Sequence, residues 1–147
     1  MKSISASLRR AVRRRAEDRC EYCQTCAELS GHDLTVDHII SRSAGGRTNL
    51  ENLCWCCFWC NAFKQARHEV LDSQSARVLL LFNPRCDDWN AHFRWSADGT
   101  RIIGLTPSGR VTVKALRLNR PVLVRARRIW VRHGYHPPRS QAHDAGS

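Results

Sequence analysis

The sequence predicts an α+β fold: a two-stranded hairpin followed by a helix, with further helices before and after it. Two Cys-x-x-Cys pairs, Cys20–Cys23 and Cys57–Cys60, lie on either side of a short β-branched segment, residues 34–40. A Gly-Gly turn follows that segment, as expected for a chain that reverses between two strands. Apolar residues at helical spacing precede the first Cys pair and recur near the end of the chain.

The bulk properties indicate a single domain that binds a polyanion. A chain of 147 residues can bury roughly 70% of its unfolded surface, which is enough for a core. The formal charge is +11, from 24 Lys+Arg against 13 Asp+Glu, and the pI is about 10.0. A basic surface kept only for solubility is the alternative. The bias toward Arg favours nucleic acid, because the guanidinium matches phosphate geometry.

The 8 cysteines indicate a metal site rather than disulfides. The first ten residues have no apolar signal-peptide region, and no apolar run is long enough to cross a membrane. We therefore expect a cytoplasmic protein with reduced thiols and no membrane partner. A redox-active Cys-x-x-Cys would need a βαβ context, which is missing here. Two such pairs supply four thiolates, the tetrahedral ligand set of structural zinc.

Residues 5–18 are predicted to form a basic helix. Leu8, Val12 and Ala16 recur every fourth residue and form a narrow apolar stripe surrounded by arginines. An exposed helix held by ion pairs is the alternative interpretation. Contact with phosphates is favoured because Glu17 and Asp18 are too few to pair with the five arginines between residues 9 and 15.

Residues 34–40 are predicted to form a strand with a polar centre. Asp37 and His38 interrupt an otherwise apolar run. A lone histidine here would most simply be a core residue, but a buried carboxylate beside it needs a partner, and a metal ion would supply one. Successive strand side chains face opposite ways. Asp37 and His38 can therefore have different roles.

The next segments complete the hairpin and add a helix. A loop over residues 41–51 turns at Gly45-Gly46, and residues 52–57 are expected to return as the second strand. Residues 58–68 are expected to form a helix. Asn61 and Lys64 are three residues apart and would share one face of it.

The C-terminal half is predicted to contain strands, a hairpin and two helices. We expect a polar connector at 69–76, a strand at 78–82, and a hairpin made by 93–95 and 101–105. Helices are expected from Thr106-Pro107 to about Leu118 and over residues 122–131. The aromatic residues around His92 fit core packing, and residues 133–147 have the composition of a disordered tail.

Taken together, these residues resemble the HNH endonuclease family. Asp37-His38, Asn52 and Cys57-x-x-Cys60-Asn61 are similar to the ββα-metal motif in its HNN variant, whose third position is Asn. The Cys pairs resemble the zinc knuckle of many members. Several further segments resemble a bacterial HNH subfamily: Arg19–Cys23, Leu81–Arg85, Trp89, His92–Trp95 and Gly104–Arg110. The resemblance implies a zinc-stapled ββα-metal core at 19–68 with a C-terminal extension at 78–132, together one domain from 1 to 132.

The resemblance also implies a role for each motif residue. His38 matches the general base, and Asn52 matches the Asn that holds the loop and orients that base. Asp37 and Asn61 match ligands of a catalytic Mg²⁺ or Mn²⁺. The implied ligands of the structural zinc are Cys20, Cys23, Cys57 and Cys60.

Other cysteines depart from the family pattern. Cys54 and Cys56 lie close enough in sequence to compete as zinc ligands, and Cys26 lies near the knuckle. Cys57 is preferred because only Cys57-x-x-Cys60 leads directly into Asn61. Cys86 and His92 receive no role.

The predicted function is therefore a metal-dependent endonuclease that hydrolyses phosphodiester bonds, in double-stranded DNA, with weak sequence specificity. Family resemblance implies 5′-phosphate and 3′-hydroxyl products. The residues expected to contact nucleic acid are Arg9, Arg13, Arg14, Lys64, Arg125 and Arg128. The first alternative is a non-catalytic zinc-ribbon module that binds nucleic acid. The second is an interaction protein that uses zinc only as a structural element.

Overall fold

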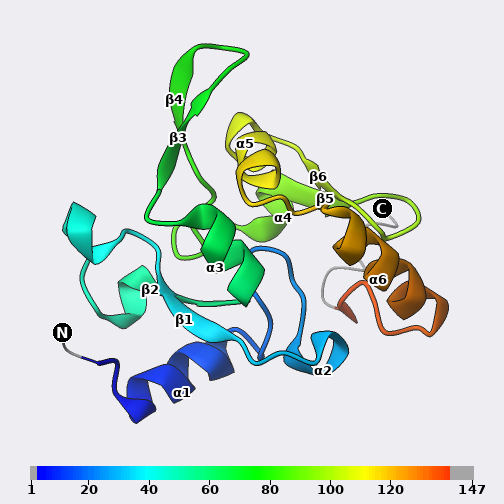
Figure 1. Cartoon of the computed structure of the whole chain (residues 1–147), viewed down its shortest axis with the longest axis horizontal. Coiled ribbons are helices and arrows are strands. Elements are labelled where there is room, and N and C mark those ends of the chain that lie inside the picture. Colours follow the sequence, from blue (N-terminus) through cyan, green and yellow to red (C-terminus); the bar gives the residue numbers. More distant parts are fainter. Residues whose placement is uncertain (1–2, 140–147) are drawn as a thin grey trace.

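The computed structural model describes residues 3–139 and combines short helices with small antiparallel sheets (Figure 1). The helices are α1 (Ala6–Arg15), α2 (Ala27–Ser30), α3 (Phe58–Lys64), α4 (Trp89–His92), α5 (Pro107–Ala115) and α6 (Pro121–Arg132). The strands are β1 (Thr35–His38), β2 (Leu53–Cys56), β3 (Glu69–Asp72), β4 (Arg77–Leu80), β5 (Phe93–Trp95) and β6 (Ile102–Gly104). In the described chain, each strand pairs only with its neighbour in sequence. This mixture of helices and small sheets fits the predicted α+β class.

The basic helix is present as α1. Its first turn is capped by the Ser5 side chain, which accepts a hydrogen bond from the Leu8 amide at 3.2 Å. Val12 is fully buried, and the helix packs against β1 and β2. Arg9, Arg10, Arg13 and Arg14 are exposed, whereas the Arg15 side chain donates to the carbonyls of Leu50 and Leu53 at the start of β2.

The central unit is the β1–β2 hairpin followed directly by α3. The register pairs Thr35 with Cys56 and His38 with Leu53. All four residues of β2 are buried, so this strand lies inside the molecule. Cys57 caps the start of α3, and the helix ends before Gln65, whose φ is 57°. The predicted helix over residues 58–68 is thus shorter than expected.

The connector expected at 69–76 is wrong, because residues 69–72 form β3. This strand pairs with β4, and Val70 lies opposite Leu79. Both are partly buried, and the hairpin contacts α5. Exposed and partly buried residues alternate along β3, which is the pattern of a half-covered strand rather than a loop. Figure 1 shows this hairpin projecting from the rest of the molecule.

The C-terminal extension has an aromatic core. Phe82, Trp89 and Phe93 are buried and in contact, with ring centroids 5.1 and 5.2 Å apart for Phe82–Phe93 and Trp89–Phe93. Thr106 caps α5 by accepting from the Gly109 amide at 3.0 Å. The predicted hairpin and both predicted helices are confirmed as β5–β6, α5 and α6, and core packing is confirmed for the aromatic residues.

The disordered tail expected from residue 133 is wrong for residues 133–139. His136 is 6% exposed, and its ring lies 4.3 Å from Trp95 and 6.0 Å from Trp130. Aromatic contacts that a composition count does not reveal thus hold this segment on the extension. The rest of the predicted tail, 140–147, lies outside the described residues. Within the described chain, no helix has the length and apolar character needed to span a membrane.

Candidate active site

Four cysteines from two distant segments come together beside α3. The Sγ atoms of Cys20, Cys23, Cys57 and Cys60 all lie within 4.8 Å of one another, and those of Cys23 and Cys57 are 3.7 Å apart. A tetrahedral zinc bound by four thiolates separates its sulfur atoms by roughly 3.8 Å. The donor set and its spacing therefore fit a structural zinc ion with no open coordination position.

Backbone contacts hold the Cys20–Cys23 turn against β2. The Glu21 amide donates to the Trp55 carbonyl at 2.9 Å, and the Glu21 carboxylate accepts from the Trp55 amide at 2.7 Å. Hydrogen bonds from Cys20, Cys57 and Cys60 lower the pKa of the Cys23 thiol. Burial and hydrogen bonds among the thiols raise the pKa of the other three cysteines, so a bound cation would be needed to hold all four as thiolates.

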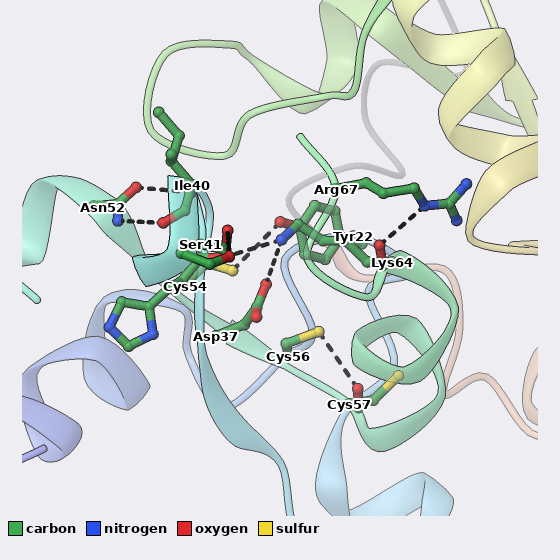
Figure 2. A network of polar contacts seen from close by, with 12 residues as sticks. Tyr22, Asp37, Ile40, Ser41, Asn52, Cys54, Cys56, Cys57, Lys64 and Arg67 are labelled. Atoms are coloured by element: carbon green, nitrogen blue, oxygen red, sulfur yellow. Dashed lines mark hydrogen bonds and ion pairs between the residues drawn. The ribbon is translucent and has the colours of Figure 1, made fainter. Parts of the chain in front are cut away.

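The remaining cysteines lie outside this group. The Cys54 thiol contacts the Tyr22 hydroxyl at 3.6 Å, and the Cys56 thiol contacts the Cys57 carbonyl at 3.4 Å (Figure 2). Cys26 is half-buried and Cys86 is exposed. In the structure, Cys57 rather than Cys54 or Cys56 completes the group of four cysteines, as predicted.

Asp37 lies at the end of β1, facing the last turn of α3 (Figure 2). Its Oδ2 atom is 3.1 Å from the ammonium of Lys64 but receives no well-aligned hydrogen bond. Burial raises the pKa of Asp37, and the neighbouring Lys64 opposes that rise. A buried carboxylate oxygen with a free lone pair is a suitable ligand for a hard divalent cation.

The assignment of Lys64 to a surface phosphate contact is wrong. Lys64 is only 1% exposed, and its ammonium also donates to the His38 carbonyl at 3.1 Å. The lysine is drawn inward because Asp37 and this carbonyl are both close to the end of α3. Its charge therefore acts inside the site rather than on its surface.

His38 is partly exposed and is held by a residue that the sequence reasoning missed. The Nε2 atom of His38 lies 2.8 Å from the hydroxyl of Thr48 in the loop between the strands. Burial lowers the pKa of His38, and Arg42 and Lys64 act in the same direction against Asp37. This shift favours the neutral imidazole, which is the form that accepts a proton. An exposed Thr in a loop carries no sequence signal of this contact.

Asn52 fixes the loop that carries Thr48. Its Oδ1 accepts from the Ile40 amide at 2.9 Å, and its Nδ2 donates to the carbonyls of Ile40 and Arg47 at 2.9 and 2.8 Å (Figure 2). At Gly46 a Cβ atom would collide with the Ile40 carbonyl and crowd the Asn52 amide. The Gly-Gly turn is thus required by the close approach of the loop to Asn52.

Asn61 lies half-buried on α3, one turn before Lys64. Residues three apart share a helix face. Because Lys64 contacts Asp37, this spacing would turn Asn61 toward β1. A carboxylate oxygen and an amide oxygen together form a donor set suited to Mg²⁺ or Mn²⁺.

Comparison with known proteins agrees with this arrangement. Residues 20–67 match the family model described as HNH endonuclease. We refer to residues 20–67 as the HNH domain. The matched residues include both Cys pairs, Asp37, His38, Asn52 and Asn61. The match indicates nuclease activity on nucleic acids. No curated protein and no solved structure matches the chain.

The arginines expected to contact nucleic acid lie outside the HNH domain. Arg9, Arg13 and Arg14 are exposed on α1, and Arg125 and Arg128 are exposed on α6. Arg13 pairs with Asp18 at 3.0 Å, and the others have no acidic partner among the described residues. Figure 1 shows α1 and α6 at separate edges of the molecule.

The HNH domain is joined to the C-terminal extension by buried polar contacts. Glu21, between the first two cysteines, forms an ion pair with Arg85. The Trp89 indole N–H donates to the Tyr22 carbonyl at 3.0 Å. The extension therefore packs directly on the Cys20–Cys23 turn.

Proposed function

We propose that this protein is a metal-dependent endonuclease that hydrolyses phosphodiester bonds in double-stranded DNA. The observation that carries the proposal is the pairing of Asp37 and His38 beside α3. A largely buried carboxylate that is ion-paired with Lys64 and an imidazole whose pKa is lowered by burial lie on consecutive residues of one strand. A metal ligand and a general base are the two groups that this hydrolysis requires.

His38 acts as the general base in this proposal. In this role Nε2 would carry the proton and donate to the Thr48 hydroxyl 2.8 Å away, leaving Nδ1 unprotonated. Nδ1 then takes a proton from the water that attacks phosphorus. Asn52 supports this geometry by holding the Thr48 loop against β1.

Asp37 and Asn61 would hold the catalytic cation. A bound Mg²⁺ or Mn²⁺ supplies charge neutralisation on the phosphate and assistance to the leaving 3′-oxygen. Lys64 adds a buried positive charge next to Asp37, at 3.1 Å from its Oδ2. The four cysteines would hold zinc for structure alone.

Arginine contacts to backbone phosphates would position the substrate. Such contacts carry no sequence information, so weak sequence preference and strong salt dependence are expected. The exposed arginines of α1 and α6 are the residues proposed for this role.

The test is cleavage of supercoiled plasmid by the purified protein with Mg²⁺ or Mn²⁺, beside His38→Ala and the control His133→Ala. His133 is exposed and lies outside the HNH domain. We expect nicked or linear plasmid from the parent and the control. Loss of the general base should slow cleavage by about 100-fold or more.

Two other outcomes would contradict the proposal. Equal cleavage by His38→Ala would show that His38 is not the base. If no variant cleaves and the plasmid still shifts on a gel, the chain is the non-catalytic zinc-ribbon module instead.

A further inference from the structure

Two exposed aromatic side chains lie next to each other at the start of α3. Phe58 is 64% exposed and Trp59 is 50% exposed, and their ring centroids are 5.2 Å apart with the ring planes nearly perpendicular. The other four tryptophans of the chain are buried. Exposed apolar surface that is contiguous in this way, on a strongly basic protein, indicates an interaction site.

The aromatic surface continues along α3 to a pair of arginines. The Trp59 ring stacks on the Phe63 ring, with centroids 5.8 Å apart and 27° between the planes. The Cζ atoms of Arg117 and Arg120 lie 4.8 and 5.9 Å from the Phe63 ring centroid. Within residues 3–139, neither arginine forms an ion pair with Asp or Glu. We call these five residues, Phe58, Trp59, Phe63, Arg117 and Arg120, the stacking surface.

An apolar cavity of about 610 Å³ lies beside the stacking surface. Trp59 and Arg120 line it together with Val122 and Ile129 of α6, and no Asp or Glu is among its lining residues. Arg125 is exposed on α6, three residues after Val122 and four before Ile129, so it shares their face of the helix. The cavity therefore lies between exposed aromatic rings and an arginine proposed above to contact phosphate.

These features fit a single strand of nucleic acid better than a second copy of this chain. Every base has a π face that can stack on an aromatic ring, and every phosphate carries a charge that arginine can pair with. A second copy would bring a charge of +11 against an equal charge. The bases inside an intact duplex cannot reach a protein ring, so the stacking surface requires unpaired bases.

The stacking surface and the proposed catalytic metal site lie on different faces of one short helix. Lys64 faces Asp37, whereas Trp59 and Phe63 are four residues apart and form a separate row on α3. A helix with its side chains is roughly 10–12 Å wide. One DNA molecule can therefore contact both faces.

We propose that the stacking surface binds the unpaired bases of a single-stranded DNA segment, so that the substrate is a duplex joined to a single-stranded arm. This inference rests on the proposed nuclease function and names the form of DNA on which it acts. Trp59 supplies the main stacking face because its ring is the larger of the two exposed rings. Arg117 and Arg120 neutralise phosphates of the arm.

The first test measures binding of a fluorescein-labelled single-stranded oligothymidylate and of a blunt duplex of the same length, without Mg²⁺ or Mn²⁺. The variants are Trp59→Ala, Phe58→Ala and Trp59→Phe. Tyr135→Ala is the control, because Tyr135 is an exposed aromatic residue outside the stacking surface. Loss of one stacked base weakens binding by about tenfold. We expect that loss for the single strand in Trp59→Ala, a smaller one in Phe58→Ala, little change in Trp59→Phe and the control, and unchanged binding of the duplex.

Trp59 itself reports the contact. Because the other four tryptophans are buried, stacking of a base on Trp59 should quench the protein fluorescence when unlabelled single strand is added. The quenching should disappear in Trp59→Phe although binding persists. In Arg117→Gln, the slope of log K against log salt concentration for the single strand should become shallower by about 0.7.

Unchanged single-strand affinity in Trp59→Ala, or equal losses for the single strand and the duplex, would overturn the proposal. So would a dimer of the parent, seen by sedimentation velocity, that Trp59→Ala abolishes, because a second copy would then cover the surface. If Trp59→Ala does not fold, Phe58→Ala and the fluorescence of the parent decide the same question.

Cleavage of duplexes with and without a single-stranded arm separates this inference from the proposed function. At DNA concentrations below saturation, the parent should cleave the armed duplex faster, and Trp59→Ala should cleave the two at equal rates. Binding of the arm without any cleavage would refute the nuclease and leave the stacking surface in place. Equal cleavage of the two duplexes by the parent would refute the armed substrate and leave the nuclease in place.

Discussion

At the scale of single residues, burial shifts the pKa values of two neighbouring groups, Asp37 and His38, in opposite directions. It raises the pKa of Asp37 and lowers that of His38, so both neutral forms are favoured. Lys64 opposes the rise in the pKa of Asp37, whereas the lowered pKa of His38 favours the neutral form that a general base needs. One buried lysine therefore supports both proposed roles.

Thr48→Val is expected to slow plasmid cleavage without loss of the fold. The substitution removes the hydroxyl that lies 2.8 Å from the His38 Nε2 and leaves the side-chain volume nearly unchanged. Loss of one such hydrogen bond, about 1.4 kcal/mol, corresponds to roughly tenfold in rate. Initial cleavage rates at several DNA concentrations provide the measurement.

The expected change in Thr48→Val lies in kcat rather than in KM, because Thr48 orients the base and does not bind substrate. Ser at the same position keeps the hydroxyl and should restore most of the rate. A rate in Thr48→Val equal to that of the parent would contradict the positioning role of Thr48.

At the scale of elements, residues 133–139, which follow α6, pack against the C-terminal extension. His136 is buried against Trp95 and Trp130. Burial lowers its pKa to about 4, and the positive charge of Arg127 acts in the same direction. The folded state therefore excludes a proton that the unfolded state binds below about pH 6.5.

Stability should consequently fall as the pH is lowered from about 6.5 to about 4, by up to about 3 kcal/mol from this group. His136→Gln removes the titrating group, so its free energy of unfolding should depend less on pH in this range than that of the parent. Urea unfolding at a series of pH values measures the difference. Parallel curves for the two proteins would show that His136 titrates normally in the folded state.

Local sequence patterns predicted the elements whose chemistry is local. The Asp37-His38 strand, the Gly turn and the Thr106 cap each depend on neighbouring residues, and the structure contains all three. The inward direction of Lys64 depends on the position of β1 relative to α3, which no local pattern encodes. The same holds for the contact between Thr48 and His38.

Two other differences between the predicted and the observed structure also arise from tertiary contacts. β3 is short and polar, so only its pairing with β4 and its contact with α5 identify it as a strand. The segment at 133–139 has a polar, Gly- and Pro-containing sequence, and ring contacts of His136 with Trp95 and Trp130 help to hold it. In both cases tertiary contacts outweigh the local preference of the chain.

At the scale of the whole molecule, the charge of +11 is spread over separate surfaces. Exposed arginines of α1 and α6 lie at different edges (Figure 1), so one duplex need not contact both. Salt dependence measures how many of these contacts form at once.

Replacing Arg9, Arg13 and Arg14 by Ala should weaken DNA binding and reduce its salt dependence. The slope of log K against log salt concentration should become shallower by about 0.9 for each lost contact, or about 2.7 for all three. The control removes three exposed arginines outside α1 and α6, namely Arg77, Arg101 and Arg110. Fluorescence anisotropy of a labelled duplex measures both slopes, and equal slopes would exclude α1 from the interface.

The projecting hairpin has a consequence for the colloidal behaviour of the protein. Leu71, Val78 and Leu80 are 69%, 60% and 63% exposed there, and Leu71 lies opposite Val78. In buffer of low ionic strength, electrostatic repulsion between the strongly basic molecules keeps the exposed apolar side chains of different molecules apart. At 1 M salt the Debye length is only about 3 Å, so that repulsion is screened while apolar attraction remains. Salt that strips nucleic acid from the protein will therefore also promote its precipitation.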